Sequence, residues 1–169
     1  APDSFWYRPI PADAPLNPDS AAYVDEFLRQ YKSYYGDVGI NTTSYSAPVY
    51  AVGAHVPTVA VAQWSCENNR DAGLVEQWSA VPMPPGAEPA DGSDAEMVVY
   101  QPSSDTLWSF WRARHVGGQW QACWGGRMTN VSKNKGIWPQ RYGVAATGLP
   151  FAPGQVTVKE LRSGVIDHV

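Results

Sequence analysis

The stretch from Trp108 to Gly126, WSFWRARHVGGQWQACWGG, constrains the fold of this chain more than any other segment. Its two arms are rich in aromatic residues, and they flank the pair Gly117-Gly118. Two consecutive glycines suit a two-residue hairpin turn that needs positive φ at both positions. The segment therefore predicts a β-hairpin in which Val116 faces Gln119 and pairing continues outward from that pair.

This register divides the side chains of the hairpin between two faces. One face holds Trp111, Ala113 and His115 opposite Trp124, Ala122 and Trp120, and the other holds Trp108, Phe110, Arg112 and Arg114 with Gln119, Gln121 and Cys123. We expect the first face to be core, because its large rings bracket a pair of alanines. The second face combines rings with arginine and glutamine, a mixture typical of sugar-binding surfaces.

The second face is therefore the predicted ligand surface. Its ligand-binding residues are expected to be Trp108, Arg112, Arg114 and Gln121. Rings stack on the apolar faces of sugars, while arginine and glutamine donate hydrogen bonds to sugar hydroxyls. The alternative is that Trp108 and Phe110 cover a second core while the arginines extend into solvent.

The segments before the hairpin predict an extended arm, a helix and several short strands. Residues 1–16 carry four prolines and read as an extended arm, which Phe5, Trp6 and Tyr7 hold against the rest of the chain. A helix follows over 18–35, with Asn17 or Asp19 as its cap, an apolar stripe at helical spacing, and Gly36 at its end. The stripe consists of Tyr23, Val24, Phe27, Leu28 and Tyr31.

Short β-branched and aromatic runs after residue 42 predict most of the remaining structure to be strand. Strands are expected within 43–52, 57–66, 95–101, 106–116 and 119–126, with a short helix over 71–81 and a proline-rich loop over 82–94. Near the end, Thr157 and Glu160 form a capping box for a short helix that Gly164 terminates, and VIDHV is a final strand.

Together, these elements in a chain of 169 residues predict a single domain. Its expected fold is a mainly β, jelly-roll-like antiparallel β-sandwich with one N-terminal helix and short peripheral helices.

The two cysteines, Cys66 and Cys123, lie at the ends of predicted strands. They are either joined by a disulfide or two buried free thiols, and their spacing alone does not decide between these. Together with three scattered histidines they give no zinc signature, so we expect neither a metal nor a cofactor.

Charge and hydropathy exclude two classes of partner. The net charge of -4 argues against nucleic acid, which requires a basic surface. No apolar run approaches the roughly 18 residues of a membrane span.

The polar residues that compete for catalytic roles are Asp105, Tyr142, Asp167 and His168, with Arg112 beside them. A lone Asp-His pair at a strand end is more often structural, and the loop carboxylates Asp91, Asp94 and Glu96 are expected to be solvated.

Several blocks resemble a known family. SFWYRPIPADAPLNPDSAAYV, INTTSYSAPVY, YQPSSDTLWSFWRAR, CWGGRM, GVAATGLP and ELRSGVIDHV are similar, in order, to segments of mostly uncharacterised actinobacterial secreted proteins. Similar modules occur in minor tail proteins of phages that infect mycobacteria and their relatives. The family continues into further strands after the last block, which implies that this chain is truncated at its C-terminus. Relatives often have a glutamate where this chain has Ser109, which weakens an enzymatic reading.

These observations favour an extracellular glycan- or cell-envelope-binding module, part of a phage tail that contacts an actinobacterial host. Its expected partners are a cell-surface or cell-wall polysaccharide and other copies or other tail proteins, and its location is secreted or virion-borne. One alternative is a glycan-cleaving enzyme, a glycoside hydrolase or polysaccharide lyase on a jelly-roll scaffold. A second alternative is a purely structural virion or surface module.

Overall fold

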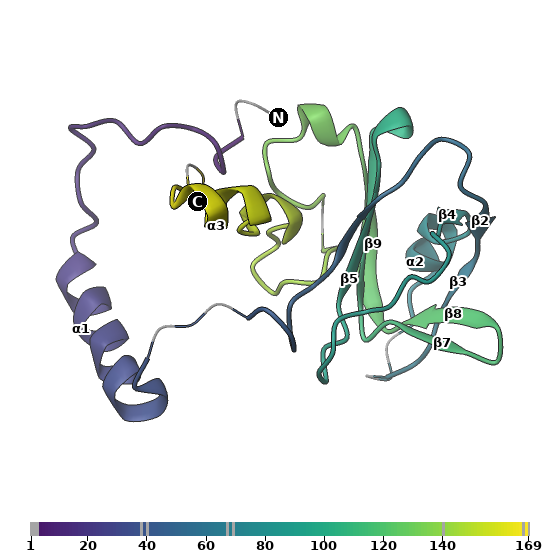
Figure 1. Ribbon diagram of the computed structural model, residues 1–169, viewed down its shortest axis with the longest axis horizontal. Helices are drawn as coiled ribbons and strands as arrows, with labels where there is room; N and C mark the ends of the chain where they lie inside the picture. Colours follow the sequence, from purple (N-terminus) through teal and green to yellow (C-terminus); the bar gives the residue numbers. More distant parts are fainter. Residues whose placement is uncertain are drawn as a thin grey trace. The chain divides into compact units, whose positions relative to one another are not determined.

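A computed structural model describes residues 4–37, 39, 41–66, 68, 70–139, 141–166 and 168 (Figure 1). The chain divides into two compact units. One unit comprises Ala1–Arg8 and Thr43–Val169, and the other comprises Pro9–Thr42. The sequence predicts one domain; in the structure all strands belong to the larger unit.

The smaller unit contains the predicted N-terminal helix. Helix α1 spans Ser20–Gln30 and continues into a π-helical turn, η1, over Tyr31–Tyr35. Gly36 ends it with φ of 64°, as predicted. Asp19 occupies the N-cap without a side-chain capping bond, while the Asn17 side chain accepts a hydrogen bond from the Asp19 backbone N–H at 2.8 Å. The predicted helix is confirmed, with its start two residues later than expected.

The larger unit is built around a four-stranded sheet with the order β1-β5-β6-β9. These strands are β1 (Val49–Ala51), β5 (Met97–Gln101), β6 (Thr106–Trp111) and β9 (Trp124–Thr129). A three-stranded sheet has the order β3-β8-β7, with β3 (Val61–Gln63), β8 (Gln119–Ala122) and β7 (Arg114–Val116). A two-stranded sheet pairs β2 (Thr58–Val59) with β4 (Val81–Pro82).

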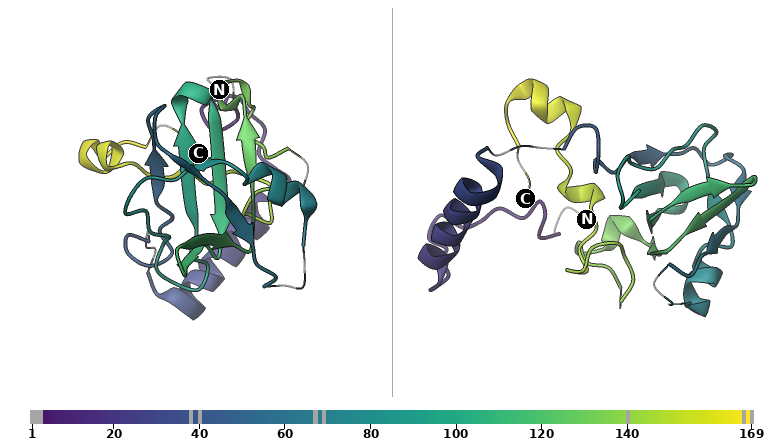
Figure 2. Two further views of the ribbon diagram at one scale, coloured as in Figure 1. Left: turned by 90° about the vertical axis from the view of Figure 1, so that its right-hand side faces the viewer. Right: turned by 90° about the horizontal axis from the view of Figure 1, so that it is seen from below.

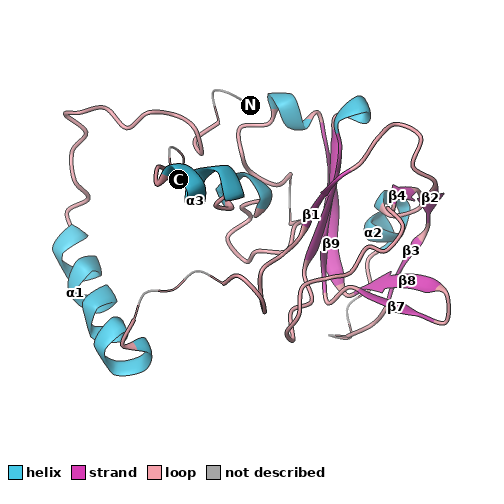
Figure 3. Ribbon diagram, viewed as in Figure 1, coloured by secondary structure: helices cyan, strands magenta, loops and turns pink. Residues whose placement is uncertain are grey.

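Short helical elements lie between and after the strands (Figure 3). They are α2 (Ala72–Gln77), α3 (Val158–Ser163) and the 3₁₀ turns η2 (Pro102–Ser104), η3 (Val131–Lys133) and η4 (Ala152–Gly154). The capping box of Thr157 and Glu160 and the terminating Gly164, at φ of 70°, are confirmed for α3. The predicted final strand is wrong for the described residues Val165, Ile166 and His168, which follow α3 without strand pairing.

The prediction of a mainly β fold is confirmed, although two strand pairs are parallel. Strand β1 runs parallel to β5, and β3 runs parallel to β8. Each pair joins segments that are far apart in sequence, and a long connection is what parallel pairing requires. The strands are therefore not antiparallel throughout, and the jelly-roll arrangement stays a prediction.

The four-stranded sheet is covered on both faces. The core on one face contains Phe110 of β6 together with Leu74 of α2 and Trp78, which follows α2. The core on the other face contains Leu107 and Trp138. In Figures 1 and 2, α2 and strands β2–β4 lie on one side of the sheet, and the chain that follows β9 lies on the other. Strand β6 is central and is buried along nearly its whole length.

The glycine turn and register of the hairpin are confirmed. Gly117 and Gly118 have φ of 58° and 79°, and Val116 pairs with Gln119. Pairing reaches Trp111 opposite Trp124. The hairpin is, however, bent at Arg112, which has a left-handed φ of 50°. Its inner half, β6 and β9, belongs to the four-stranded sheet, whereas its outer half, β7 and β8, pairs with β3.

The two faces of the inner half are the reverse of those predicted. Trp108 and Phe110, expected on the ligand face, are 5% and 0% exposed in the core, whereas Trp111 and Trp124, expected in the core, are only half-buried. The physical reason is that α2 packs its Leu74 onto the Trp108 face.

The disulfide and the attachment of the arm are confirmed. Cys66 follows β3 and is bonded to Cys123, which lies between β8 and β9, with their Cα atoms 5.6 Å apart. Trp6 donates its Nε1–H to the Gly136 carbonyl at 3.2 Å, and the Phe5 N–H donates to the Lys135 carbonyl at 3.4 Å. Among the described residues, none of the helices has the length and apolar character that crossing a membrane requires.

Candidate functional site

An open cavity of about 560 Å³ lies at the end of the sheet where Trp111 pairs with Trp124. Its walls are Trp111, Trp124, Arg141 and Tyr142, and the segment 144–148 completes it. We call it the aromatic pocket. Its size falls within the range of small-ligand sites.

The rings of the aromatic pocket are held by a stacking contact, a hydrogen bond and a cation–π contact. Trp124 and Tyr142 are stacked, with ring centroids 6.3 Å apart and an interplanar angle of 26°. Trp111 donates its Nε1–H to Asp94 Oδ1 at 3.0 Å, and the guanidinium of Arg112 lies 4.4 Å from the centre of the Trp111 ring system. The contacts with Arg112 and between Trp124 and Tyr142 use one face of each ring, so the half-exposed rings retain apolar surface on which a flat ligand can stack.

Asp71 positions the polar wall of the pocket. It is the N-cap of α2, where its Oδ1 accepts from the Leu74 N–H at 3.2 Å. The same buried carboxylate accepts hydrogen bonds from the Arg141 guanidinium and from the Tyr142 hydroxyl, the latter at 3.3 Å. Gly73 permits this approach, because a Cβ there would overlap the Tyr142 hydroxyl.

The charge of Asp71 is maintained by its partners. Burial by itself would raise the pKa of Asp71, but the hydrogen bonds from Arg141 and from the Leu74 N–H outweigh it and hold the pKa below its usual value. The ion pair with Asp71 in turn raises the pKa of Arg141. Arg141 therefore stays charged, and because its side chain is 70% exposed, its remaining donors are accessible from solvent at the pocket.

A hydrogen-bond chain ties this wall to the disulfide region. The Asp71 N–H donates to Gln63 Oε1 at 2.7 Å, and Gln63 Nε2 donates to the Cys123 carbonyl at 3.1 Å. Strand β3, helix α2 and the β8–β9 junction are thereby held in one arrangement beneath the aromatic pocket.

Two carboxylates flank the same end of β6. Asp94 accepts from Trp111, and Glu96 precedes Met97, whose side chain is buried in the core on the Phe110 face. Glu96 directly precedes β5, whose Met97 pairs with Phe110, the neighbour of Trp111, and Glu96 is half-buried. Burial, with a smaller contribution from the charge of Asp94, raises the pKa of Glu96 to about 7.

The four predicted ligand residues do not form one site, although Arg114 and Gln121 are in contact. Trp108 is in the core and donates its Nε1–H to the Gln77 carbonyl at 3.2 Å. Arg112 contacts Trp111, which lines the aromatic pocket, but Arg112 does not itself line it. Arg114 instead donates to Gln121 at 2.9 Å on the outer half of the hairpin, and its guanidinium lies 4.0 Å from the centre of the Trp64 ring system.

The predicted catalytic residues are also dispersed. Asp105 precedes the far end of β6 and accepts from the Ser132 hydroxyl at 2.7 Å, a bond that lowers the pKa of Asp105. His168 contacts Glu160 at 3.1 Å, and Asp167 lies outside the described residues. Tyr142 alone of the four lines the aromatic pocket.

Sequence reasoning missed Asp71 and Arg141, and its expectation that Glu96 is solvated is wrong, because Glu96 is half-buried. Asp71 was detectable, since an aspartate directly before the helical pattern AGLVEQ is an N-cap signal. Its ion pair with Arg141 spans 70 residues, and no local pattern encodes such a contact.

Comparison of the chain with protein-family models, with curated proteins and with solved structures finds no match. Within the part of the chain that the structure describes, no group of three or more histidine, cysteine, aspartate or glutamate side chains is arranged to hold a metal ion.

Proposed function

We propose that this protein is an extracellular module that binds a glycan of a cell envelope in the aromatic pocket. The observation that carries the proposal is the set of half-exposed rings at Trp111, Trp124 and Tyr142 beside the charged Arg141. Rings that stack on sugar faces, next to a fixed guanidinium that donates to hydroxyls, are the elements that a saccharide site needs.

An extracellular setting is supported by the Cys66–Cys123 disulfide, because disulfides persist mainly in oxidising compartments. The resemblance of the sequence blocks to actinobacterial secreted proteins and phage minor tail proteins supports a more specific setting. We propose a phage tail module that contacts the host surface, with a cell-wall polysaccharide and other tail proteins as its partners.

A retention assay tests this proposal. The purified protein is passed over immobilised arabinan, galactan and peptidoglycan from actinobacteria, and both retention and released products are scored. We expect retention on at least one polymer, and loss of that retention in Trp111→Ala. Trp120→Ala is the matched control, because Trp120 is a half-buried tryptophan of the same hairpin outside the pocket. Equal loss in both variants contradicts the proposal.

A second candidate function rests on Glu96. Glycoside hydrolysis uses a protonated carboxyl group as acid and a second carboxylate, and enzymes raise the pKa of the acid by burial. Glu96, with its pKa at about 7 and Asp94 nearby, has this character, so a glycan-cleaving enzyme on a jelly-roll-like scaffold is the alternative. Released oligosaccharides that disappear in Glu96→Gln would favour the enzyme. A protein that neither retains nor cleaves any of the polymers would favour a structural module.

A further inference from the structure

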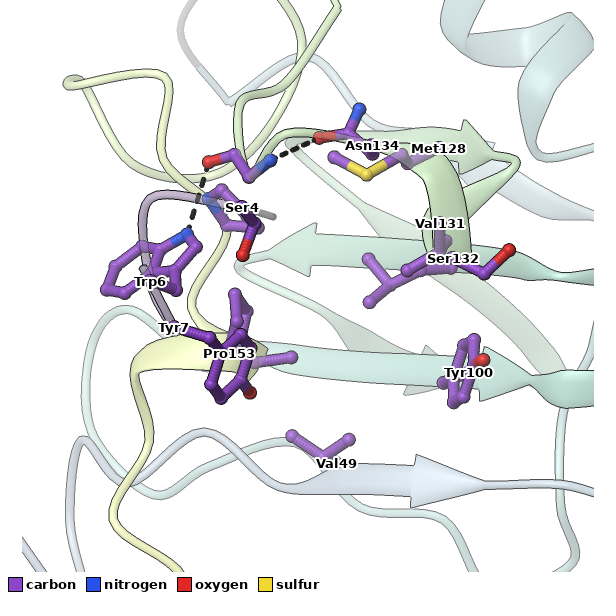
Figure 4. Close-up of a pocket in the computed structure, with 14 residues that line it drawn as sticks. Ser4, Trp6, Tyr7, Val49, Tyr100, Met128, Val131, Ser132, Asn134 and Pro153 are labelled. Carbon is purple, nitrogen blue, oxygen red and sulfur yellow. Dashed lines mark hydrogen bonds between the residues drawn. The ribbon is translucent and has the colours of Figure 1, made fainter. Parts of the chain in front are cut away.

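A second pocket, of about 380 Å³, lies on the same unit and is built quite differently (Figure 4). Its floor takes one side chain from each strand of the four-stranded sheet: Val49, Tyr100, Leu107 and Met128. Pairing of Tyr100 with Leu107 and of Leu107 with Met128 places these side chains on one face. The N-terminal arm and the segments 131–136 and 150–153 form the walls. We call it the sheet pocket.

The walls of the sheet pocket are fixed before any ligand enters. Trp6, which lines the pocket, donates to the Gly136 carbonyl. Side chains at Gly136 or Gly154 would overlap the Trp6 ring, so the indole lies directly against both backbones. A preformed wall lowers the entropic cost of binding.

The lining of the sheet pocket is neutral and mainly apolar. None of its lining residues is an aspartate, glutamate, lysine, arginine or histidine. Two of its polar side chains are engaged by the scaffold: Ser132 donates its hydroxyl to Asp105 at 2.7 Å, and Asn134 Oδ1 accepts from the Gly136 N–H at 2.7 Å. This lining is unsuited to a saccharide, which needs many polar partners, and to a charged ligand.

Ser4 is the exception among these polar groups. Its side chain is 2% exposed, and among the described residues its hydroxyl has no hydrogen-bond partner. Figure 4 shows this hydroxyl pointing into the pocket. Buried hydroxyls are nearly always paired, because an unpaired one loses its bonds to water without replacement. The pocket thus offers one buried, unpaired hydroxyl within mainly apolar walls, to which the more exposed Tyr7 and Tyr100 also contribute.

We propose that the sheet pocket binds a neutral, mainly apolar small molecule that carries one hydrogen-bonding oxygen, and that Ser4 recognises this oxygen. A cavity of about 150 Å³ suffices for benzene, so this pocket accommodates a ligand of roughly two fused rings. The inference is independent of glycan binding, since the aromatic pocket shares no lining residue with the sheet pocket.

The test uses 2-naphthol and naphthalene, which differ only in the hydroxyl group. Binding to the intact chain is measured by fluorescence titration of each compound. We expect 2-naphthol to bind more tightly than naphthalene, and Ser4→Ala to weaken 2-naphthol by roughly fivefold to tenfold while leaving naphthalene unchanged. Equal affinity of the two compounds for the unmodified protein overturns the proposal without any variant.

Two further variants locate the binding. Ala152→Phe places a ring in the sheet pocket and is expected to abolish binding of both compounds, with a thermal melt to confirm folding. Trp111→Ala alters only the aromatic pocket and is expected to leave both affinities unchanged. Binding that survives Ala152→Phe in the folded protein, or that is lost in Trp111→Ala, contradicts the proposal. Failure of glycan retention has no bearing on these outcomes.

Discussion

Trp108 and Trp111 lie three residues apart on strand β6, yet they have opposite environments. Trp108 faces α2 and is part of the core, whereas Trp111 faces the segment 141–148 and lines an open pocket. Both positions follow from a correctly predicted register. Strand pairing therefore determines which side chains share a face of the sheet. Which face becomes core depends on the other elements that pack against it.

The largest expected effect is the loss of Trp108. Replacing it with alanine removes a buried indole, and we expect the free energy of unfolding to fall by about 3–5 kcal/mol. Trp111→Ala, which removes a half-buried ring, is expected to cost no more than about half as much. Urea unfolding of the two variants measures both values. A larger loss of stability for Trp111→Ala than for Trp108→Ala would mean that Trp111 is in the core and Trp108 is the half-exposed residue, the reverse of the arrangement described.

Loss of the disulfide is expected to have the next largest effect. The bond joins residues 57 apart, and a closed loop of this length contributes about 2–4 kcal/mol. We expect reduction, or the double change Cys66→Ser with Cys123→Ser, to lower the melting temperature. Alkylation of the native, non-reduced protein followed by mass spectrometry should find neither thiol reactive; two alkylated cysteines would contradict the bond.

Replacement of Asp71 tests the buried carboxylate that holds Arg141 and Tyr142 at the aromatic pocket. Asp71→Asn weakens the cap of α2 and the bond to Arg141, and we expect a loss of about 1–2 kcal/mol. Because folding lowers the pKa of Asp71, its stabilisation is present above the ordinary carboxyl value and is lost as the pH falls below about 4. The difference in the free energy of unfolding between the native protein and Asp71→Asn should therefore be largest near pH 7 and should shrink as the pH falls below about 4. Urea unfolding at both pH values checks this, and a difference that does not change with pH would argue against the ion pair.

The smallest expected effect is the pH dependence that arises from Glu96. Its pKa of about 7 lies above the ordinary value of 4.5, so the folded state favours the protonated form. The corresponding stability is present below pH 4.5 and is lost as the pH rises toward about 7. We expect Glu96→Gln to be more stable than the native protein at pH 8 and similar at pH 4.5. Thermal melts at both values check this, and an unchanged difference would count against a buried Glu96.

The elements that the sequence predicted correctly are those with local signals. The turn at Gly117-Gly118 and the capping box at Thr157 are set by residues within a few positions of one another. The parallel pairing of β1 with β5 depends on where distant segments meet, and no turn chemistry specifies it. The break at Arg112 also escaped prediction, because a left-handed arginine has no pattern of its own.

The site was predictable to a smaller extent. The abundance of rings in the hairpin pointed to the correct segment, and Tyr142 was among the candidate residues. Arg141 acquires its role only through Asp71, and that contact exists only when α2 lies beside the end of β9. Trp108 was predicted as a ligand residue in place of Trp111 for a similar reason. The local sequence does not show that α2 packs on the Trp108 face of the sheet.

We propose that a glycan contacts the half-exposed rings at the inner end of this hairpin. The most direct measurement follows the indole N–H resonances of assigned tryptophans in ¹H–¹⁵N spectra while a retained oligosaccharide is added. The resonances of Trp111 and Trp124 should shift in a saturable manner, while those of the buried Trp78 and Trp108 should not. Shifts confined to Trp120, on the outer half of the hairpin, and to Trp64, which follows β3, would contradict this proposal.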